Sequence, residues 1–358
     1  MEARAWVVRA GRHGEDEGSN LQEGRATIGW HEIGDLTEMQ TREQVRRIVD
    51  EVFAGDHPSR QAIFAGQLWA FRDTIRAGDL ILMPLKSQPG QIAFGRCTGE
   101  YAYDREADAH RRHFRPVQWQ PDLVPRSALG GDLLAMVNAS MTVFSPSRND
   151  AANRLRAVAA TGVDPGLSGG STAGAGAGGD GLDASGNAGD AQVTDPAPAP
   201  TLDAIKDQVR AFVMTRFREH ELTRLVAAIL EALGFVCDVS PAGPDGGVDI
   251  LAGSGPLGFD APTIVVEVKS EPGAVGSAVL RTLHSAVTRY NAHHGVLVAW
   301  GGVSKPAMAE FSHLRTTIRV WDSETLLDKL FQTYPRLPEH IRAQLPLKQA
   351  WVLDDESA

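Results

Sequence analysis

The 358 residues of the chain suffice for two domains of ordinary size, and a hydrophobic content of 42% lets each domain bury a core. No apolar stretch approaches the length that crosses a bilayer, and the amino-terminal sequence lacks the layout of a signal peptide. We therefore expect a cytoplasmic protein that does not enter a membrane. The two cysteines, Cys97 and Cys237, fall in different halves, which argues against a disulfide framework and a structural zinc site.

The net charge of −10 is unfavourable for a nucleic-acid binder, because affinity for the phosphate backbone comes largely from clustered cations. Two stretches, residues 110–115 and 216–224, could supply such clusters. Each stretch is equally well interpreted as a solvated face. Carboxylates that hold a metal ion would account for part of the negative charge.

The first half, residues 1–146, alternates short strands with two helices. One helix follows Thr41, where Gln44 completes a capping box. A second helix spans about Ser59 to Ile75 and leads through a glycine turn into a central strand. Strands are predicted near residues 6–9, 27–30, 79–83, 91–95 and 114–119. Short strands around one core indicate an α+β domain built as a small β-barrel.

A segment dominated by Gly, Ala, Ser and Pro follows, from Thr161 to Pro200. This composition buries too little apolar surface to offset its ordering entropy. We therefore expect residues 147–202 to be a flexible linker with a root-mean-square span of roughly 35 Å. Such a tether would leave the two domains without a fixed mutual orientation.

The second half begins with a predicted helix from about Asp203 to Leu233, which ends before Gly234. Strands are predicted at residues 246–250, 264–269, 295–298 and 317–322, with one helix at 304–314 and another that is capped by Ser323 and runs through Leu330. This order predicts an α/β domain over residues 203–335, followed by a tail at 336–358.

Two carboxylates and a lysine stand on the predicted strands. Glu267 and Lys269 are two residues apart and so share one face, and Asp249 follows two glycines that let a ligand approach. Carboxylates hold hard divalent cations, and a lysine can orient or stabilise an attacking water, which together suit phosphodiester hydrolysis. The alternative is an ordinary edge strand with an exposed Glu–Lys pair, which contributes little. Glu221, on the preceding helix, supplies a third carboxylate.

Residues 205–333 resemble the Mrr-type catalytic domain of the PD-(D/E)xK nuclease superfamily. The likeness rests on His220-Glu221-Leu222, Leu230 to Phe235, Asp245 to Ile250 and Val266 to Lys269. It implies a restriction-endonuclease-like fold in which Asp249 and Glu267 ligate Mg²⁺ or Mn²⁺ and Lys269 acts on the nucleophilic water. Glu221 would be an auxiliary carboxylate, and Asp245 competes with Asp249 for its role. Many Mrr-type domains carry glutamine at the position of Glu267.

The first half resembles the barrels of PUA and EVE type that some Mrr-like restriction proteins carry at their amino-terminal end. The residues that carry this likeness are 6–11, 28–30, 67–71, 78–80 and 95–101. It implies that the domain reads a modified or flipped base between aromatic walls. Trp30 and Tyr101, beside glycine turns, are the best pocket candidates, with Arg9, Asp35 and Gln67 as polar contacts. The alternative for each aromatic residue is a place in the core.

These expectations combine into a metal-dependent DNA endonuclease that restricts modified foreign DNA, in the manner of type IV restriction enzymes. Its partner would be double-stranded DNA, and cutting both strands would need a homodimer or two successive nicks. In one alternative, the barrel binds a nucleotide signal that activates an anti-phage DNase. In another, the chain is a non-catalytic DNA-binding adaptor.

Overall fold

The computed structural model describes residues 3–11, 13–139, 141–166, 193–196, 202–241 and 248–349. The chain divides into two compact units, Met1–Ala204 and Ile205–Ala358, so the expected two-domain organisation is confirmed. Within these ranges, no helix has both the length and the apolar character that a membrane span requires.

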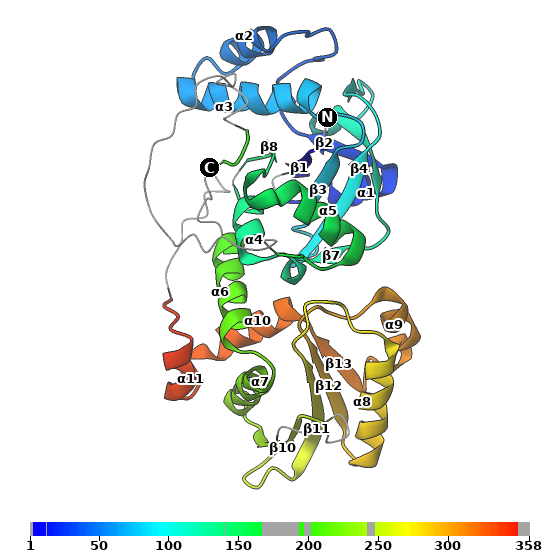
Figure 1. The fold of residues 1–358 in the computed structure, drawn as a ribbon, viewed down its shortest axis with the longest axis vertical. Coiled ribbons are helices and arrows are strands. Elements are labelled where there is room, and N and C mark those ends of the chain that lie inside the picture. The colour runs from blue at the N-terminus through cyan, green and yellow to red at the C-terminus, as the bar shows by residue number, and fades with distance from the viewer. Residues whose placement is uncertain are drawn as a thin grey trace. The chain divides into compact units, whose positions relative to one another are not determined.

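The first unit is built on a mixed eight-stranded sheet (Figure 1). The path runs β2-β6-β4-β3-β1-β8, with β5 on β6 and β7 on β4, and only β1 and β3 pair in parallel among the named strands. The strands are β1 (Ala5–Val8), β2 (Arg25–Ile28), β3 (Leu80–Pro84), β4 (Gln91–Cys97), β5 (Ala102–Tyr103), β6 (His113–Trp119), β7 (Val124–Pro125) and β8 (Val143–Phe144). The α+β character is as predicted, but over the described residues the sheet is an open half-barrel and not a closed PUA- or EVE-type barrel.

Helices cover both faces of this sheet, which is why all four residues of β1 are buried. Trp6 and Val8 pack with α2 and α3, whereas Ala5 and Val7 pack with α4 and α5. The helices are α1 (Glu17–Glu23), α2 (Arg42–Val52), α3 (Pro58–Trp69, continued by a π-helical turn at Ala70–Thr74), α4 (Gly131–Val137) and α5 (Ala151–Thr161). The capping box of Thr41 and Gln44 is present at the start of α2, as predicted.

The second unit is a five-stranded sheet of order β13-β12-β11-β10-β9, covered on both faces by helices (Figure 1). Strands β11, β12 and β13 are parallel, and β10 is antiparallel to β11 and β9. The strands are β9 (Val236–Val239), β10 (Ile250–Ser254), β11 (Asp260–Lys269), β12 (His294–Ala299) and β13 (Ile318–Trp321). The helices are α6 (Leu202–Arg216), α7 (His220–Ala232), α8 (Ser277–Arg289), α9 (Lys305–Glu310), α10 (Ser323–Thr333) and α11 (Glu339–Gln344).

The two faces of this sheet carry different helices. Ile264, Val266 and Val298 pack against α7 and α10, whereas Val265 and Leu297 pack against α8. The alternation along β11 is the period of two that a strand with both faces buried imposes. It assigns each side chain at the end of β11 to one face or the other.

Four boundary predictions were wrong. The helix predicted over 203–233 is two helices, because the chain turns at Glu219, whose φ is +47°. Residues 151–161, predicted as linker, form α5, whose Leu155 and Val158 are buried. The predicted tail contains α11, whose Ile341 joins the core of the second unit. Helix α10 is capped by the Asp322 side chain, not by Ser323.

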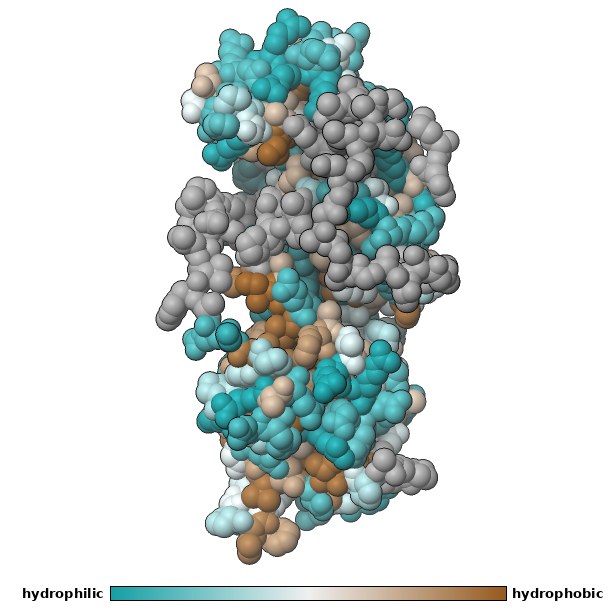
Figure 2. Space-filling view, turned by 60° about the vertical axis from the view of Figure 1, so that its left-hand side comes forward, coloured by the Kyte–Doolittle hydropathy of each residue, from teal (hydrophilic) through white to brown (hydrophobic). Residues whose placement is uncertain are grey.

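The face that Figure 2 shows is largely hydrophilic where it is coloured, whereas the hairpin between β10 and β11 exposes large apolar side chains. Leu257 and Phe259 in this hairpin are 75% and 83% exposed, and Val236 on the edge strand β9 is exposed beside Gly258. This end of the second unit is therefore apolar.

Candidate active site

Asp249 stands at the start of β10, beside the end of β11. The register that pairs Ile250 with Val266 continues to place Asp249 across from Glu267. The backbone N–H of Asp249 donates to the Val266 carbonyl (2.8 Å), and its carboxylate Oδ2 accepts from the N–H of Val268 (2.7 Å). Both the backbone and the side chain of Asp249 are thus fixed against β11.

Glu267 and Lys269 share the face of β11 that α8 covers, as their spacing predicted. Glu267 Oε1 lies 3.1 Å from Lys269 Nζ. The Glu267 side chain is only 4% exposed, and its second oxygen, Oε2, has no hydrogen-bond partner among the described residues. Lys269, at 32% exposed, reaches solvent. Solvent therefore reaches the cluster at Lys269, whereas Glu267 is buried.

Burial raises the pKa of Glu267 above its ordinary value, and the negative charge of Asp249 adds to this, although Lys269 opposes it. For Lys269, burial acts to lower the pKa, but the carboxylates of Glu267, Asp249 and Glu271 outweigh it and hold the pKa above its usual value. The site thus contains two neighbouring carboxylates, whose negative charge a cation would stabilise. It also contains one ammonium group, which stays protonated at neutral pH.

Of the other predicted carboxylates, Glu221 does not join this cluster. Glu221 lies on α7, which packs on the opposite face of the sheet, and it pairs with Arg224 at 2.8 Å. Among the described residues, Glu221 makes no hydrogen bond or ion pair with the cluster. Asp245, the predicted competitor of Asp249, lies outside the described residues together with Gly246 and Gly247.

No group of three or more His, Cys, Asp or Glu residues that could hold a metal ion is found in the described ranges. The acidic donors brought together are therefore the two carboxylates of Asp249 and Glu267. A hard cation with only two protein carboxylates completes its coordination with water and substrate oxygens, which is the usual situation for Mg²⁺.

Sequence reasoning passed over Glu271 and Ser240. The charge of Glu271 acts on Lys269, and the Ser240 N–H donates to the Asp249 carbonyl at 2.9 Å. Glu271 continues the two-residue spacing of Glu267 and Lys269, so extending the strand pattern past Lys269 would have found it. Ser240 carries no such signal, because its contact depends on the pairing of β9 with β10.

Two base-binding candidates of the first unit are structural. Tyr101 is buried, and its hydroxyl accepts from the N–H of Leu36 (3.2 Å) and contacts His113 Nδ1 (2.8 Å). Gln67 is buried as well, and its carbonyl oxygen accepts from the backbone N–H groups of residues 142–143. Their polar groups are already occupied within the protein.

Each of the remaining three candidates has contacts of its own within the described part of the chain. Arg9 donates to two carbonyls of the segment 137–139, and Asp35 binds its own loop. Trp30, half-buried and with a φ of +55°, packs edge-on against Phe64 at a centroid distance of 5.7 Å. The first unit instead has a pocket of about 360 Å³ lined by Glu15, His31, Ala109 and His110.

Comparison with known proteins gives a family match for most of the second unit. Residues 214–330 match the family model described as restriction endonuclease, and residues 6–128 match a domain of unknown function. No curated protein matches the chain.

Similar solved structures include the DNA modification-dependent restriction endonuclease AspBHI, with 16% identity over 95% of this chain and 84% of that one and a TM-score of 0.32. They also include the MspJI restriction endonuclease in complex with a 27-mer oligonucleotide, with 11% identity, 95% and 79% coverage and a TM-score of 0.34. The protein AF1548, of unknown function, is 16% identical over 35% of this chain and 78% of that one, with a TM-score of 0.26. Residues 214–330 match the family model, and they contain the five-stranded sheet and the carboxylates of Asp249 and Glu267. These residues therefore form a restriction-endonuclease domain of the Mrr type.

Proposed function

We propose that this protein is a metal-dependent DNA endonuclease that restricts modified foreign DNA in the cytoplasm. The observation that carries the proposal is the convergence of Asp249, Glu267 and Lys269 at one end of a nuclease-type sheet. A structural ion pair alone does not account for it, because one buried oxygen of Glu267 has no hydrogen-bond partner in the described ranges of the chain.

The donor set fits a hard divalent cation such as Mg²⁺ or Mn²⁺. Glu267 offers a buried oxygen that no described residue binds, and Asp249 has a second carboxylate oxygen beside the one that binds Val268. Bound there, such an ion would polarise the scissile phosphate and lower the pKa of its water. It would also supply the positive charge that the buried Glu267 lacks.

Lys269 contributes a positive charge beside Glu267. Its pKa is held above the usual lysine value, so the ammonium group keeps its protons at neutral pH. An ammonium 3.1 Å from Glu267 can donate to a phosphate oxygen or orient a water molecule. Glu221, on the opposite face and paired with Arg224, would act only through water or after a rearrangement of α7.

Each chain carries one such cluster, so cleavage of both strands of a duplex takes two chains or two successive nicks. A homodimer at the DNA is the simplest arrangement, and we include it in the proposal. Matched DNAs that are unmodified, methylated, hydroxymethylated or phosphorothioated test the whole assignment when digested with Mg²⁺. Cutting of at least one modified DNA, sparing of the unmodified DNA, and a complete stop on chelation are the expected results. If no substrate is cut with Mg²⁺ or Mn²⁺, the endonuclease assignment is wrong.

Recognition of the modified base would belong to the pocket at His31 and His110. Two imidazole rings line it, and imidazole rings stack on bases. His110 Nε2 is held 3.1 Å from the buried carboxylate of Asp16, whose pKa burial raises. The pocket thus combines flat rings with one carboxylate, that of Glu15, which is of the type that accepts the N–H donors of a base edge.

His110→Ala should weaken binding of modified DNA by about tenfold or more, because one base-stacking contact is worth about 1–3 kcal/mol. Fluorescence anisotropy with modified and unmodified duplexes measures the loss, which should be confined to the modified one. His313→Ala, which removes an exposed histidine from the second unit, is the matched control. Equal affinities of parent and His110→Ala for the modified duplex would exclude this pocket as the reader.

A further inference from the structure

The buried carboxylate of Asp79 organises one edge of the sheet in the first unit. Asp79 is 6% exposed, and its Oδ1 accepts from the backbone N–H of Arg4 (2.9 Å). Its Oδ2 accepts from the backbone N–H of Arg76 (3.0 Å) and from Trp6 Nε1 (3.0 Å). The Arg4 carbonyl in turn accepts from the Leu80 N–H (2.9 Å). One carboxylate thus holds the backbones of two arginines close together.

A third arginine lies beside them on a neighbouring strand. Strands β4, β3 and β1 are adjacent in the sheet (Figure 1). The register pairs Arg96 with Leu80, and Leu80 with Ala5. Because neighbouring strands are about 4.8 Å apart, the backbones of Arg96 and Ala5 are separated by about 10 Å. Arg4, Arg76 and Arg96 are all exposed, and we call these three residues the arginine edge.

The arginine edge carries positive charge that the described part of the chain does not neutralise. None of its three side chains makes an ion pair or a hydrogen bond with a described residue. Several other arginines of the first unit have carboxylate partners: Arg25 pairs with Asp104, Arg46 with Asp50 and Arg60 with Asp56. In a chain with a net charge of −10, three neighbouring cations without such partners form a local positive surface.

The stretch 110–115, which the sequence indicated as a candidate cation cluster, is less available for a ligand. Arg111 pairs with Glu23, and Arg115 is 3% exposed and donates to three backbone carbonyls. The side chains of the arginine edge are exposed instead, so they can meet the phosphates of a nucleic acid.

We infer that the arginine edge binds the phosphate backbone of double-stranded DNA. Guanidinium groups bind phosphate oxygens through charge-assisted hydrogen bonds, which are often bidentate. Successive phosphates of one DNA strand are about 3.4 Å apart along the helix axis, so an edge of about 10 Å meets about three of them. The choice of DNA as the partner rests on the proposed function, whereas the arrangement of the arginines does not.

The arginine edge and the pocket at His31 and His110 belong to the same unit, and β6 connects them. Arg96 pairs with Gln118 of β6, and the first residue of this strand, His113, follows His110 by three positions. The strand from Gln118 back to His113 extends about 17 Å, which equals the rise of about five base pairs. A duplex with a base in the pocket thus has the length to place its backbone on the arginine edge.

The test measures the salt dependence of DNA binding by the full chain. The probe is an unmodified DNA duplex without divalent metal, so neither cleavage nor recognition of a modification enters the result. The triple variant Arg4→Gln, Arg76→Gln and Arg96→Gln should lower the slope of log affinity against log salt by about 0.9 per arginine. At about 0.15 M salt it should bind on the order of 100-fold more weakly. Asp79 binds backbone N–H groups, so these substitutions leave its hydrogen bonds in place.

A control variant with the same loss of charge carries Arg42→Gln, Arg47→Gln and Arg60→Gln, on α2 and α3 of the same unit. Its slope and affinity should stay near those of the parent. A triple lysine variant of the arginine edge keeps the charge and should keep most of the slope. Equal losses in the two glutamine variants, or unchanged binding by the edge variant, would overturn the inference.

Two further outcomes separate this inference from its alternatives. Double-stranded RNA that binds more tightly than DNA, with the same loss in the edge variant, would assign the arginine edge to RNA and overturn the inference. Cleavage of modified DNA is scored separately. A chain that cuts no DNA but shows the expected change in slope would lose the proposed nuclease function and keep this inference.

Discussion

Lys269→Ala should lower the rate of DNA cleavage by about 10²–10³-fold, the usual loss when one charge-stabilising donor leaves an active site. Lys269 is the ion-pair partner of Glu267, 3.1 Å away. Without it, the buried Glu267 would shift further toward its neutral form and bind a divalent cation less well. Single-turnover cleavage of a modified duplex at saturating enzyme and Mg²⁺ isolates this effect from binding.

DNA affinity provides the internal control for this prediction. Lys269→Ala removes one cation, so equilibrium binding without divalent metal should change by less than about tenfold. Lys305→Ala removes an exposed lysine from α9 of the same unit and should leave the cleavage rate near that of the parent. Cleavage by Lys269→Ala at the parental rate would remove this residue from the mechanism.

The parts of the fold that the sequence predicted are those with local causes. The capping box at Thr41 joins groups three residues apart, and the core-facing stripe of α7 follows from helical spacing alone. The shared face of Glu267 and Lys269 likewise needs only the period of a strand. These features depend only on residues that are close in the sequence, and not on the rest of the fold.

The features that the sequence did not predict involve contacts between distant residues. Tyr101 and Gln67 looked available for a ligand, but backbone groups 65 and 75 residues away occupy them. The hydrogen bond from Arg148 to the Asp195 carbonyl joins residues 47 apart. Composition does not reveal such a contact, so the sequence predicted a linker over this region. Glu221 was placed near the site by its order in the chain, and only the packing of α7 shows which face it occupies. A polar side chain in a sequence does not reveal whether the protein itself satisfies it.

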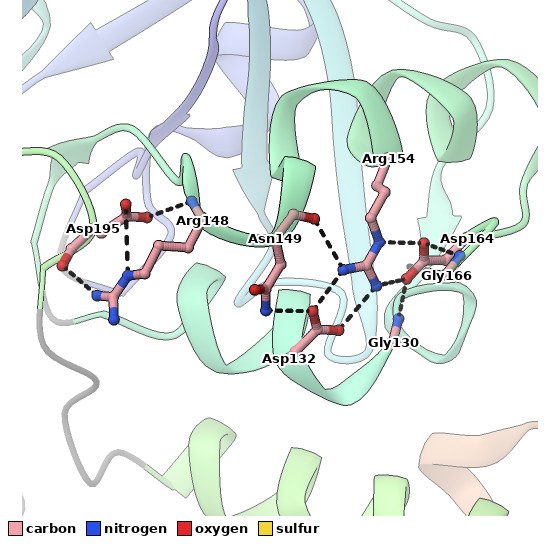
Figure 3. Close-up of polar contacts among 8 residues, drawn as sticks. All are labelled: Gly130, Asp132, Arg148, Asn149, Arg154, Asp164, Gly166 and Asp195. Carbon is pink, nitrogen blue, oxygen red and sulfur yellow. Dashed lines mark hydrogen bonds and ion pairs between the residues drawn. The ribbon is translucent and has the colours of Figure 1, made fainter. Parts of the chain in front are cut away.

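Arg154→Met should lower the free energy of unfolding of the first unit by about 3 kcal/mol, since breaking a buried ion pair from one side leaves uncompensated charge. Arg154 binds Asp132 as well as Asp164, and methionine keeps the length of its stem while removing the charge (Figure 3). We take the low end of the usual range because Asp132 is one-third exposed. Hydrogen exchange of peptides from the first unit, followed in urea, reports on this unit alone.

Arg156→Met is the matched control for this substitution. Arg156 lies two residues further along α5, and it donates to the Ala3 carbonyl and to Asn153, without a carboxylate partner among the described residues. Loss of these exposed or half-buried contacts should lower stability by less than about 1 kcal/mol. An equal loss in both variants would mean that the packing of the stem, and not the charge of Arg154, holds this corner together.

The pH dependence of the stability lost in Arg154→Met distinguishes a loss of charge from a loss of packing. Hydrogen bonds from Arg154 hold the pKa of Asp132 below its ordinary value. Burial alone would raise the pKa of Asp164, but Arg154 and two backbone N–H groups outweigh it. Both carboxyl groups have pKa values in the folded protein below the ordinary 3.8, so the unfolded chain binds more protons in acid. The stability that the two ion pairs contribute is therefore complete above about pH 5. It is lost as the pH falls through the pKa values of the folded protein. The stability gap between parent and Arg154→Met should therefore be largest at neutral pH and narrow below about pH 4, whereas a gap that stays constant would point to lost packing.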